Sequence, residues 1–148
     1  MKVEIEINKQ FAFRKFHHFE MMLQKIVTKA LQVTNSAGIS YNVSLLLCSN
    51  EYISELNKQF RGKDCPTNVL SFSDGETLDG TQYLGDIAIS IPKITEEALE
   101  QNKTFRTHFV HMFTHGILHL LGFDHQTLDD TKTMENLEDE ILSYISSM

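Results

Sequence analysis

Four segments of the chain have the apolar pattern of β-strands: residues 2–7, 39–48, 68–72 and 84–91. In the first of them polar and apolar residues alternate, so that Val3, Ile5 and Ile7 lie on one side of the predicted strand. The polar segment 74–82 carries two glycines and is expected to form a flexible loop.

Five further segments repeat their apolar residues at the spacing of an amphipathic helix: residues 16–33, 51–60, 92–103, 104–121 and 131–145. Ser49 or Asn50 can cap the second of them, and Pro92 suits the first turn of the third. Helices and strands mix along the chain without an internal repeat. The sequence therefore predicts a single α+β domain over residues 1–148, with helices packed on a sheet of about four strands.

The charge of the chain limits its partners. Its formal net charge is −7, which argues against broad, non-specific binding of nucleic acid but permits a local basic patch. Much of the acid lies in residues 96–100 and 129–140. Both stretches are expected to be solvated surfaces, away from any anionic substrate.

Two absences bear on where the protein works. No apolar run reaches the length of a membrane span, and the first thirty residues carry charges throughout, unlike a signal peptide. Cys48 and Cys65 are far apart and predict neither a disulfide framework nor a thiolate zinc site. We therefore expect a cytoplasmic protein without a membrane partner.

The clearest chemical signal is the motif His115-Gly-Ile-Leu-His119-Leu-Leu-Gly122-Phe-Asp-His125. Two histidines four residues apart share one helical face and can reach one ion with bonds of about 2.0–2.1 Å. Gly122 can end the helix in a left-handed conformation and turn the chain back, so that His125 becomes a third ligand. The alternative is a set of surface or core histidines that are satisfied by local hydrogen bonds.

Three imidazoles with a fourth position open to water are typical of a catalytic zinc site, here at the C-terminal end of a central helix. Nickel, copper and cobalt also accept three imidazoles. Zinc peptidases of the HExxH type carry a glutamate directly after the first histidine, where it acts as general base. This chain has Gly116 there. A metzincin-like metallopeptidase, with a base from elsewhere in the chain, is therefore the second candidate.

Two separated blocks resemble a known family. The first is Phe-Arg-Gly-Lys-Asp-Cys-Pro-Thr-Asn-Val-Leu-Ser-Phe at 60–72 with Leu-Gly-Asp-Ile-Ala-Ile-Ser at 84–90, and the second is residues 111–125 around the histidine motif. They resemble the bacterial YbeY family. The resemblance implies a zinc-dependent endoribonuclease, specific for single-stranded RNA, that acts in 16S rRNA 3′-end maturation and in ribosome quality control. Its partners would be rRNA and the small ribosomal subunit, with no DNA expected.

By position, the resemblance implies that His115, His119 and His125 hold the zinc and that Arg61 is the important arginine beside the site. A guanidinium can hold a phosphate through two parallel hydrogen bonds and stabilise charge that grows on it. The alternative is an arginine at a helix end that faces the helix's own carbonyls. Lys63 either adds positive field or is an exposed lysine without a role.

Three more polar residues accompany the motif. His108 and His111 share the side of the helix that carries His115. We expect His108 to be a satisfied polar group, while His111 can contact RNA, support a ligand or be satisfied internally. Asp124 can orient a ligand imidazole or cap a local turn. The expected reaction is metal-assisted phosphodiester hydrolysis, and a ribosome-assembly factor that binds RNA without cutting it is the third candidate.

Overall fold

The computed structural model describes residues 1–11, 16–36 and 38–146. Its sheet has four main strands, in the order β1 (Lys2–Lys9), β2 (Ser40–Cys48), β5 (Thr81–Ser90) and β3 (Val69–Ser73). The short β4 (Thr77–Leu78) pairs with the start of β5. β1, β2 and β5 are parallel, and β3 runs antiparallel to β5. The predicted α+β class is confirmed.

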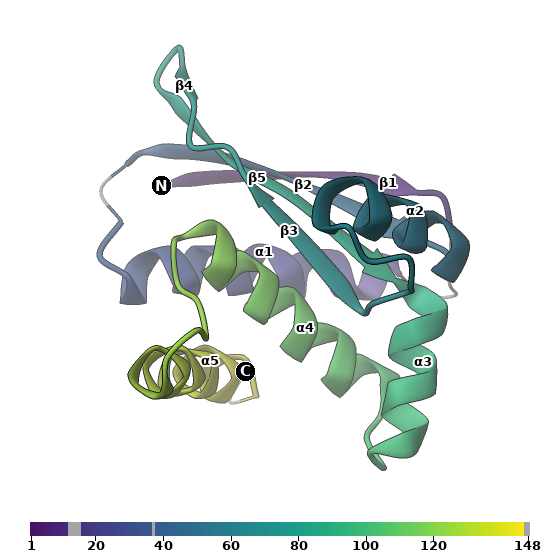
Figure 1. Ribbon diagram of the computed structural model, residues 1–148. Helices are drawn as coiled ribbons and strands as arrows, with labels where there is room; N and C mark the ends of the chain where they lie inside the picture. The colour runs from purple at the N-terminus through teal and green to yellow at the C-terminus, as the bar shows by residue number, and fades with distance from the viewer. Residues whose placement is uncertain (12–15, 37, 147–148) are drawn as a thin grey trace.

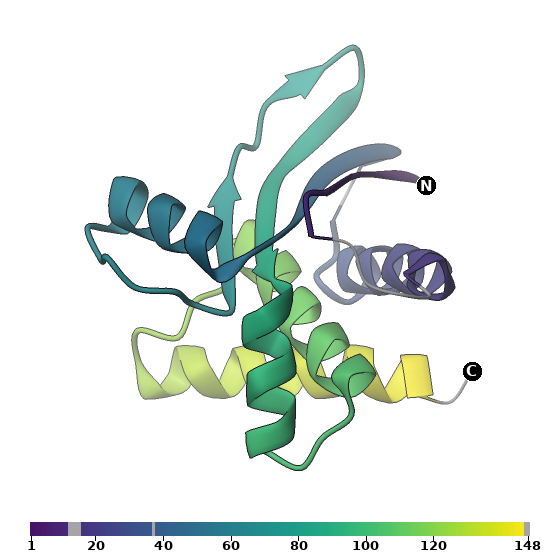
Figure 2. The same ribbon diagram turned by 90° about the vertical axis from the view of Figure 1, so that its right-hand side faces the viewer.

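The helices of the described chain lie on both faces of this sheet (Figures 1 and 2): α1 (His17–Val33), α2 (Asn50–Arg61), α3 (Ile91–Glu100), α4 (Phe105–Leu120) and α5 (Leu128–Ser146). α2 covers part of one face. α1 and α4 cover the other face, and α5 packs against both of them as an outer layer. α4 is therefore enclosed between the sheet and α5, which makes it the central helix of the fold.

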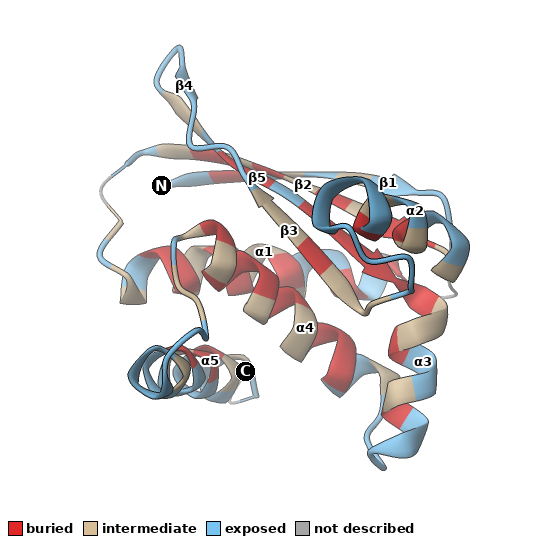
Figure 3. Ribbon diagram, in the orientation of Figure 1, coloured by how far each residue is buried: buried red, intermediate tan, exposed pale blue. Residues whose placement is uncertain are grey.

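The alternating pattern of β2 shows how the sequence places the core. Its residues Tyr41, Val43, Leu45 and Leu47 are buried, and the residues between them are half-buried. The buried side belongs to the main core shared with α1 and α4, and a smaller cluster lies under α2. Figure 3 shows the buried residues along the sheet and on the sides of α1 and α4 that face it.

The prediction of a flexible loop over residues 74–82 is wrong, because β4 and the start of β5 form a hairpin there. Asp79 and Gly80 at its tip have φ values of 51° and 79°. Two successive residues with positive φ are typical of a type I′ turn, for which Asp-Gly is a preferred sequence. The Asp-Gly pair was therefore the signal for a hairpin.

The end of α4 follows the prediction made from Gly122. This glycine has a φ of 99°, and its N–H donates to the His119 carbonyl at 3.0 Å. The N–H of Phe123 donates to the Leu118 carbonyl, also at 3.0 Å. This pair of bonds is the Schellman motif, which turns the chain back beside the helix that it ends. His125 is thereby brought next to the last turn of α4.

The cysteines and the apolar character of the helices were also considered in the sequence. Cys48 is a buried free thiol and Cys65 an exposed one, so the described chain has no disulfide between them. Within the described residues, none of the helices has both the length and the apolar character needed to cross a membrane.

Candidate metal centre

Three histidine rings converge at the C-terminal end of α4. His115, His119 and His125 each offer one ring nitrogen, and these three atoms lie within 4.8 Å of one another. Nε2 of His115 and Nε2 of His119 are 3.0 Å apart. Two nitrogens on one tetrahedral zinc lie about 3.3 Å apart when each bond is about 2.0–2.1 Å. The spacing of the three rings is therefore close to what a single ion requires.

The pKa of His119 also suits a metal ligand. Burial lowers the pKa of His119, and the neighbouring His115 and His125 lower it further. A lowered pKa favours the neutral imidazole, which is the form that binds a metal. A donor set of three neutral nitrogens fits zinc, with one coordination position left for water or substrate. The residues present thus fit the ion that the family resemblance implies.

Glu138 on α5 is a member of this site that the sequence analysis missed. Its Oε2 lies 2.6 Å from Nδ1 of His115, and its Oε1 lies 3.2 Å from Nε2 of His111. The residue is 5% exposed. Burial acts to raise the pKa of Glu138, but the hydrogen bonds and charges of His111 and His115 outweigh it and lower the pKa to about 2. Glu138 is therefore a buried carboxylate anion held between two histidines.

The bond to His115 has a clear consequence for metal binding. Because Glu138 holds Nδ1, the ring of His115 presents Nε2 to the cluster. Carboxylate–histidine–metal arrangements fix the tautomer and the direction of the ligand ring and raise its basicity. The ring of His111 is also bound to Glu138, and contact of this histidine with RNA stays a prediction.

Glu138→Gln is expected to weaken zinc binding about 10- to 100-fold, because the neutral amide no longer raises the basicity of the His115 ring. Competition with a chromophoric chelator measures this affinity. Glu135→Gln is the matched control, since Glu135 is an exposed residue on the same helix, one turn earlier. An unchanged affinity in Glu138→Gln would show that the carboxylate only stabilises the packing of α5.

Asp124 was expected either to orient a ligand imidazole or to cap a local turn, and its contacts partly match both roles. Its Oδ1 accepts a hydrogen bond from the backbone N–H of His125 at 2.7 Å, which lowers the pKa of the Asp124 carboxyl. The same oxygen lies 4.0 Å from Nδ1 of His119, too far for a direct hydrogen bond. Asp124 therefore orders the turn that carries His125 and adds negative charge beside His119.

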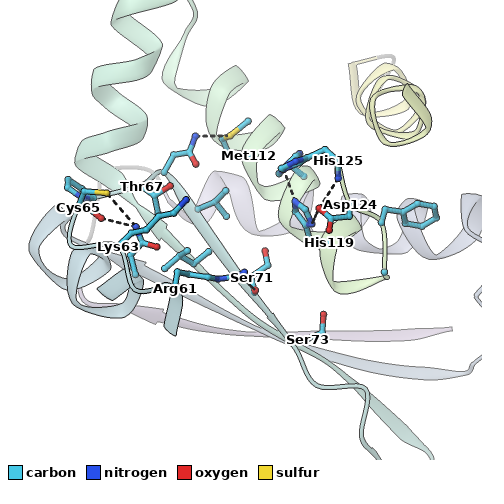
Figure 4. Close-up of a pocket in the computed structure, with 18 residues that line it drawn as sticks. Arg61, Lys63, Cys65, Thr67, Ser71, Ser73, Met112, His119, Asp124 and His125 are labelled. Atoms are coloured by element: carbon cyan, nitrogen blue, oxygen red, sulfur yellow. Dashed lines mark hydrogen bonds and ion pairs between the residues drawn. The ribbon is translucent and has the colours of Figure 1, made fainter. Parts of the chain in front are cut away.

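The histidines open onto a cleft of about 950 Å³. Figure 4 shows Arg61 and Lys63 on one side of this cleft and His119, Asp124 and His125 on the other. Arg61 is the last residue of α2, and Gly62 ends that helix with a φ of 70°. The basic residues of the first sequence block and the histidines of the second thus line one cavity, although they are more than fifty positions apart in the chain.

Arg61 does not face the carbonyls of its own helix, which was the alternative to a phosphate contact. Its Nη2 donates to the backbone carbonyl of Ser71 on β3 at 3.1 Å, so the guanidinium does not cap its own helix. The guanidinium carbon also lies 5.7 Å from the centre of the Phe72 ring. Both contacts hold the exposed arginine against β3, at the wall of the cleft (Figure 4). Lys63 lines the same wall and is exposed.

Both acidic stretches were expected to be solvated, but each contains one glutamate that is bound to histidine instead. Glu138, in the second stretch, is buried against His115 and His111, and Glu97, in the first, has its Oε1 2.8 Å from Nε2 of His108. The two exceptions have one physical reason. A histidine buried inside a helical layer needs a partner, and a carboxylate on the neighbouring helix supplies one. His108 is satisfied at Nε2 only, because its buried Nδ1 has no partner among the described residues.

Gly116, where a zinc peptidase would carry its glutamate, is the point at which α4 touches the sheet. A Cβ atom added to Gly116 would lie 3.1 Å from Oγ of Ser71 and 3.2 Å from Cδ1 of Ile87. The Ser71 hydroxyl in turn donates to the Gly116 carbonyl at 3.3 Å. A side chain larger than glycine's would force Ser71 or Ile87 to shift. The close packing of α4 on the sheet therefore suits glycine, and the chain carries no base at this position.

This fold and site together define a class of protein. A central helix that ends in three convergent histidines, with a cleft that also carries an arginine, is suited to metal-dependent hydrolysis. The family model described as Endoribonuclease YbeY matches residues 4–146. The chain belongs to this family, as the sequence resemblance predicted. The expected enzyme class, a hydrolase that cleaves RNA internally, is the class for which the family is named.

Individual relatives support the same assignment. A protein from Neorickettsia sennetsu named Endoribonuclease YbeY is 37% identical over 144 residues, which is 97% of each chain. A protein of the same name from Francisella tularensis subsp. tularensis is 44% identical over 130 residues, covering 82% of this chain and 77% of its own. The solution structure of TM1509 from Thermotoga maritima aligns with a TM-score of 0.62 and 26% identity, over 97% of this chain and 93% of that one.

Proposed function

We propose that this protein is a zinc-dependent endoribonuclease that cleaves single-stranded RNA. The observation that carries the proposal is the convergence of His115, His119 and His125 on one point of a cleft that Arg61 also lines. In keeping with the family resemblance, we place the reaction in 16S rRNA 3′-end maturation and ribosome quality control. The small ribosomal subunit would be the partner and the cytoplasm the compartment.

The residues of the site divide the work of hydrolysis between them. A bound zinc would supply a Lewis acid for a phosphoryl oxygen and would acidify a water molecule. His115, His119 and His125 hold that ion, and Glu138 keeps the His115 ring in the required tautomer.

Arg61 is suited to bind the phosphate group of the substrate. A guanidinium has five N–H donors in a planar fork, and one nitrogen of Arg61 is used by the Ser71 carbonyl. The remaining donors can hold two phosphate oxygens and stabilise the charge that develops on them. The bond to Ser71 positions the guanidinium on the wall of the cleft before substrate arrives, which reduces the entropy lost on binding. Lys63 adds positive charge on the same side.

The packing at Gly116 argues against the peptidase alternative. Peptide hydrolysis by zinc uses a general base beside the ion, and the HExxH helix provides it as a glutamate. In this chain the corresponding position is Gly116, which packs against Ser71 and Ile87 and supplies no base. Phosphodiester cleavage benefits instead from a cation that neutralises the phosphate, and Arg61 lines the cleft.

A substrate panel tests the proposed activity. Zinc-loaded protein is expected to cut a labelled single-stranded RNA, to cut the same sequence in a duplex much more slowly, and to leave single-stranded DNA and casein intact. A chelator should stop the cleavage, and added zinc should restore it. Casein hydrolysis without RNA cleavage would establish the peptidase instead, and RNA binding without any cleavage would establish an assembly factor.

A further inference from the structure

His108 and Glu97 form an internal pair that lies outside the cluster of three histidines. Nε2 of His108 is 2.8 Å from Oε1 of Glu97, and the histidine side chain is 3% exposed. Nδ1 of His108 is buried and has no hydrogen-bond partner among the described residues. A buried polar atom without a partner costs stability, so a structure that keeps one needs an explanation.

The same carboxylate connects this pair to the cleft. Nδ2 of Asn68 donates to Oε1 of Glu97 at 3.0 Å and also lies 3.3 Å from the sulfur of Met112. Asn68 and Met112 both line the cleft that holds the three histidines. One amide group, just before β3, is therefore held by residues of α3 and α4.

These contacts fix the direction of the Asn68 amide. An amide nitrogen carries two hydrogens, and the Glu97 oxygen and the Met112 sulfur accept both of them. Oδ1 of Asn68 has no hydrogen-bond partner within the described chain and is open to solvent. The wall of the cleft therefore presents a hydrogen-bond acceptor in a defined orientation.

The position of Asn68 relative to the histidines suggests what this acceptor meets. Met112 precedes His115 by three residues, so their side chains lie on one side of α4, about one turn apart. Asn68 contacts the sulfur of Met112 and lines the same cleft as His115, so it lies along the cleft to one side of the three histidines. In that place it would face the nucleotide next to the cleaved phosphate. An oxygen acceptor repels a phosphate but binds a donor on a ribose or a base.

We propose that Asn68 is a substrate-recognition residue whose Oδ1 accepts a hydrogen bond from a nucleotide beside the cleaved phosphate. Glu97 and His108 hold the amide in the orientation that this bond requires. The inference rests on the proposed cleavage of RNA in the same cleft. A nucleotide has two kinds of donor that fit, the ribose 2′-hydroxyl and the amino group of a base.

The test combines Asn68→Ala with small changes in a single-stranded RNA oligonucleotide. One series replaces single riboses by deoxyribose, leaving out the ribose whose 2′-oxygen adjoins the cleaved phosphate. A second series removes amino groups, by replacing guanosine with inosine or adenosine with purine riboside. In the unchanged protein one of these changes should lower kcat/KM about tenfold, and in Asn68→Ala the same change should have no further effect. The series in which this occurs identifies the donor.

Two other variants separate recognition from folding. Asn57 of α2 also lines the cleft, but its Nδ2 donates to the carbonyl of Cys65, in the loop after α2, at 2.9 Å. Asn57→Ala should therefore change the rates for all oligonucleotides by one factor. Glu97→Ala frees the Asn68 amide and should shrink the tenfold effect for the same oligonucleotide. The affinities of the same variants for non-cleavable forms of these oligonucleotides, measured without turnover, should show the same pattern as the kcat/KM values.

The outcomes are distinct. If every substrate change keeps its full effect in Asn68→Ala, Asn68 does not recognise the nucleotide, even though the protein cleaves RNA. If the zinc-loaded protein cleaves no RNA at all, the proposed function fails, and this inference fails with it.

Discussion

His119→Ala is expected to abolish both metal binding and RNA cleavage. The ring centre of His119 lies 4.6 Å from that of His115 and 5.2 Å from that of His125, so His119 is one corner of the triangle that the three rings form. Two imidazoles hold zinc far less tightly than three, because a tetrahedral site loses one of its few protein ligands. Zinc per chain should fall from about one ion to near zero in the same purification.

Elemental analysis and the RNA cleavage assay together measure this effect. His18→Ala is the control, because His18 is an exposed histidine outside the cleft. It should keep one ion per chain and the full rate. A His119→Ala protein that retains both zinc and activity would place the metal site elsewhere in the chain.

Arg61→Ala is expected to lower kcat/KM for RNA about 100- to 1000-fold while the zinc content stays the same. The magnitude is that of removing a group that stabilises transition-state charge. The metal should be unaffected, because the guanidinium contacts Ser71 and Phe72 and none of the three histidines. Arg61→Lys should recover only part of the rate, since an ammonium group provides charge without the planar fork.

Lys63→Ala is the matched control for Arg61. Both are exposed cations on one wall of the cleft, but no bond to β3 is observed for Lys63. Its loss should lower the rate by only a few-fold, and less at high salt, as expected for a screened charge. Loss of zinc in Arg61→Ala would show instead that this arginine supports the structure of the site. Equal losses in the two variants would reduce Arg61 to a contributor of charge.

Much of the site could be predicted because its determinants are local. The spacing of His115 and His119 depends only on helix geometry. The return of the chain to His125 depends on a glycine at the helix end, which Gly122 supplies with its positive φ. Both features can be recognised within the eleven consecutive residues of the motif, without knowledge of how distant segments pack.

Glu138 could not be found in the same way, because its partner His115 is 23 residues away on another helix. Only the packing of α5 against α4 brings the two together. One signal did exist. Met134, Glu138 and Ile141 share one side of α5, and all three are buried, so a glutamate interrupts an apolar stripe. A charged residue in such a stripe needs a buried partner.

Arg61 illustrates a second limit of sequence reasoning. Its place at a helix end permitted contact with the helix's own carbonyls or with a phosphate. The structure adds a third contact, the Ser71 carbonyl, which depends on β3 passing beside the end of α2. The pairing of β3 with β5 sets that path, and local residue patterns contain no information on it.

The most direct measurement for the whole account is a zinc titration of metal-free protein, with single-stranded RNA cleavage followed at each step. If the three histidines hold one catalytic ion, activity should begin near zero, rise in proportion to added zinc and level off at one ion per chain. Full cleavage by the metal-free protein, or a plateau reached only at two ions per chain, would contradict it.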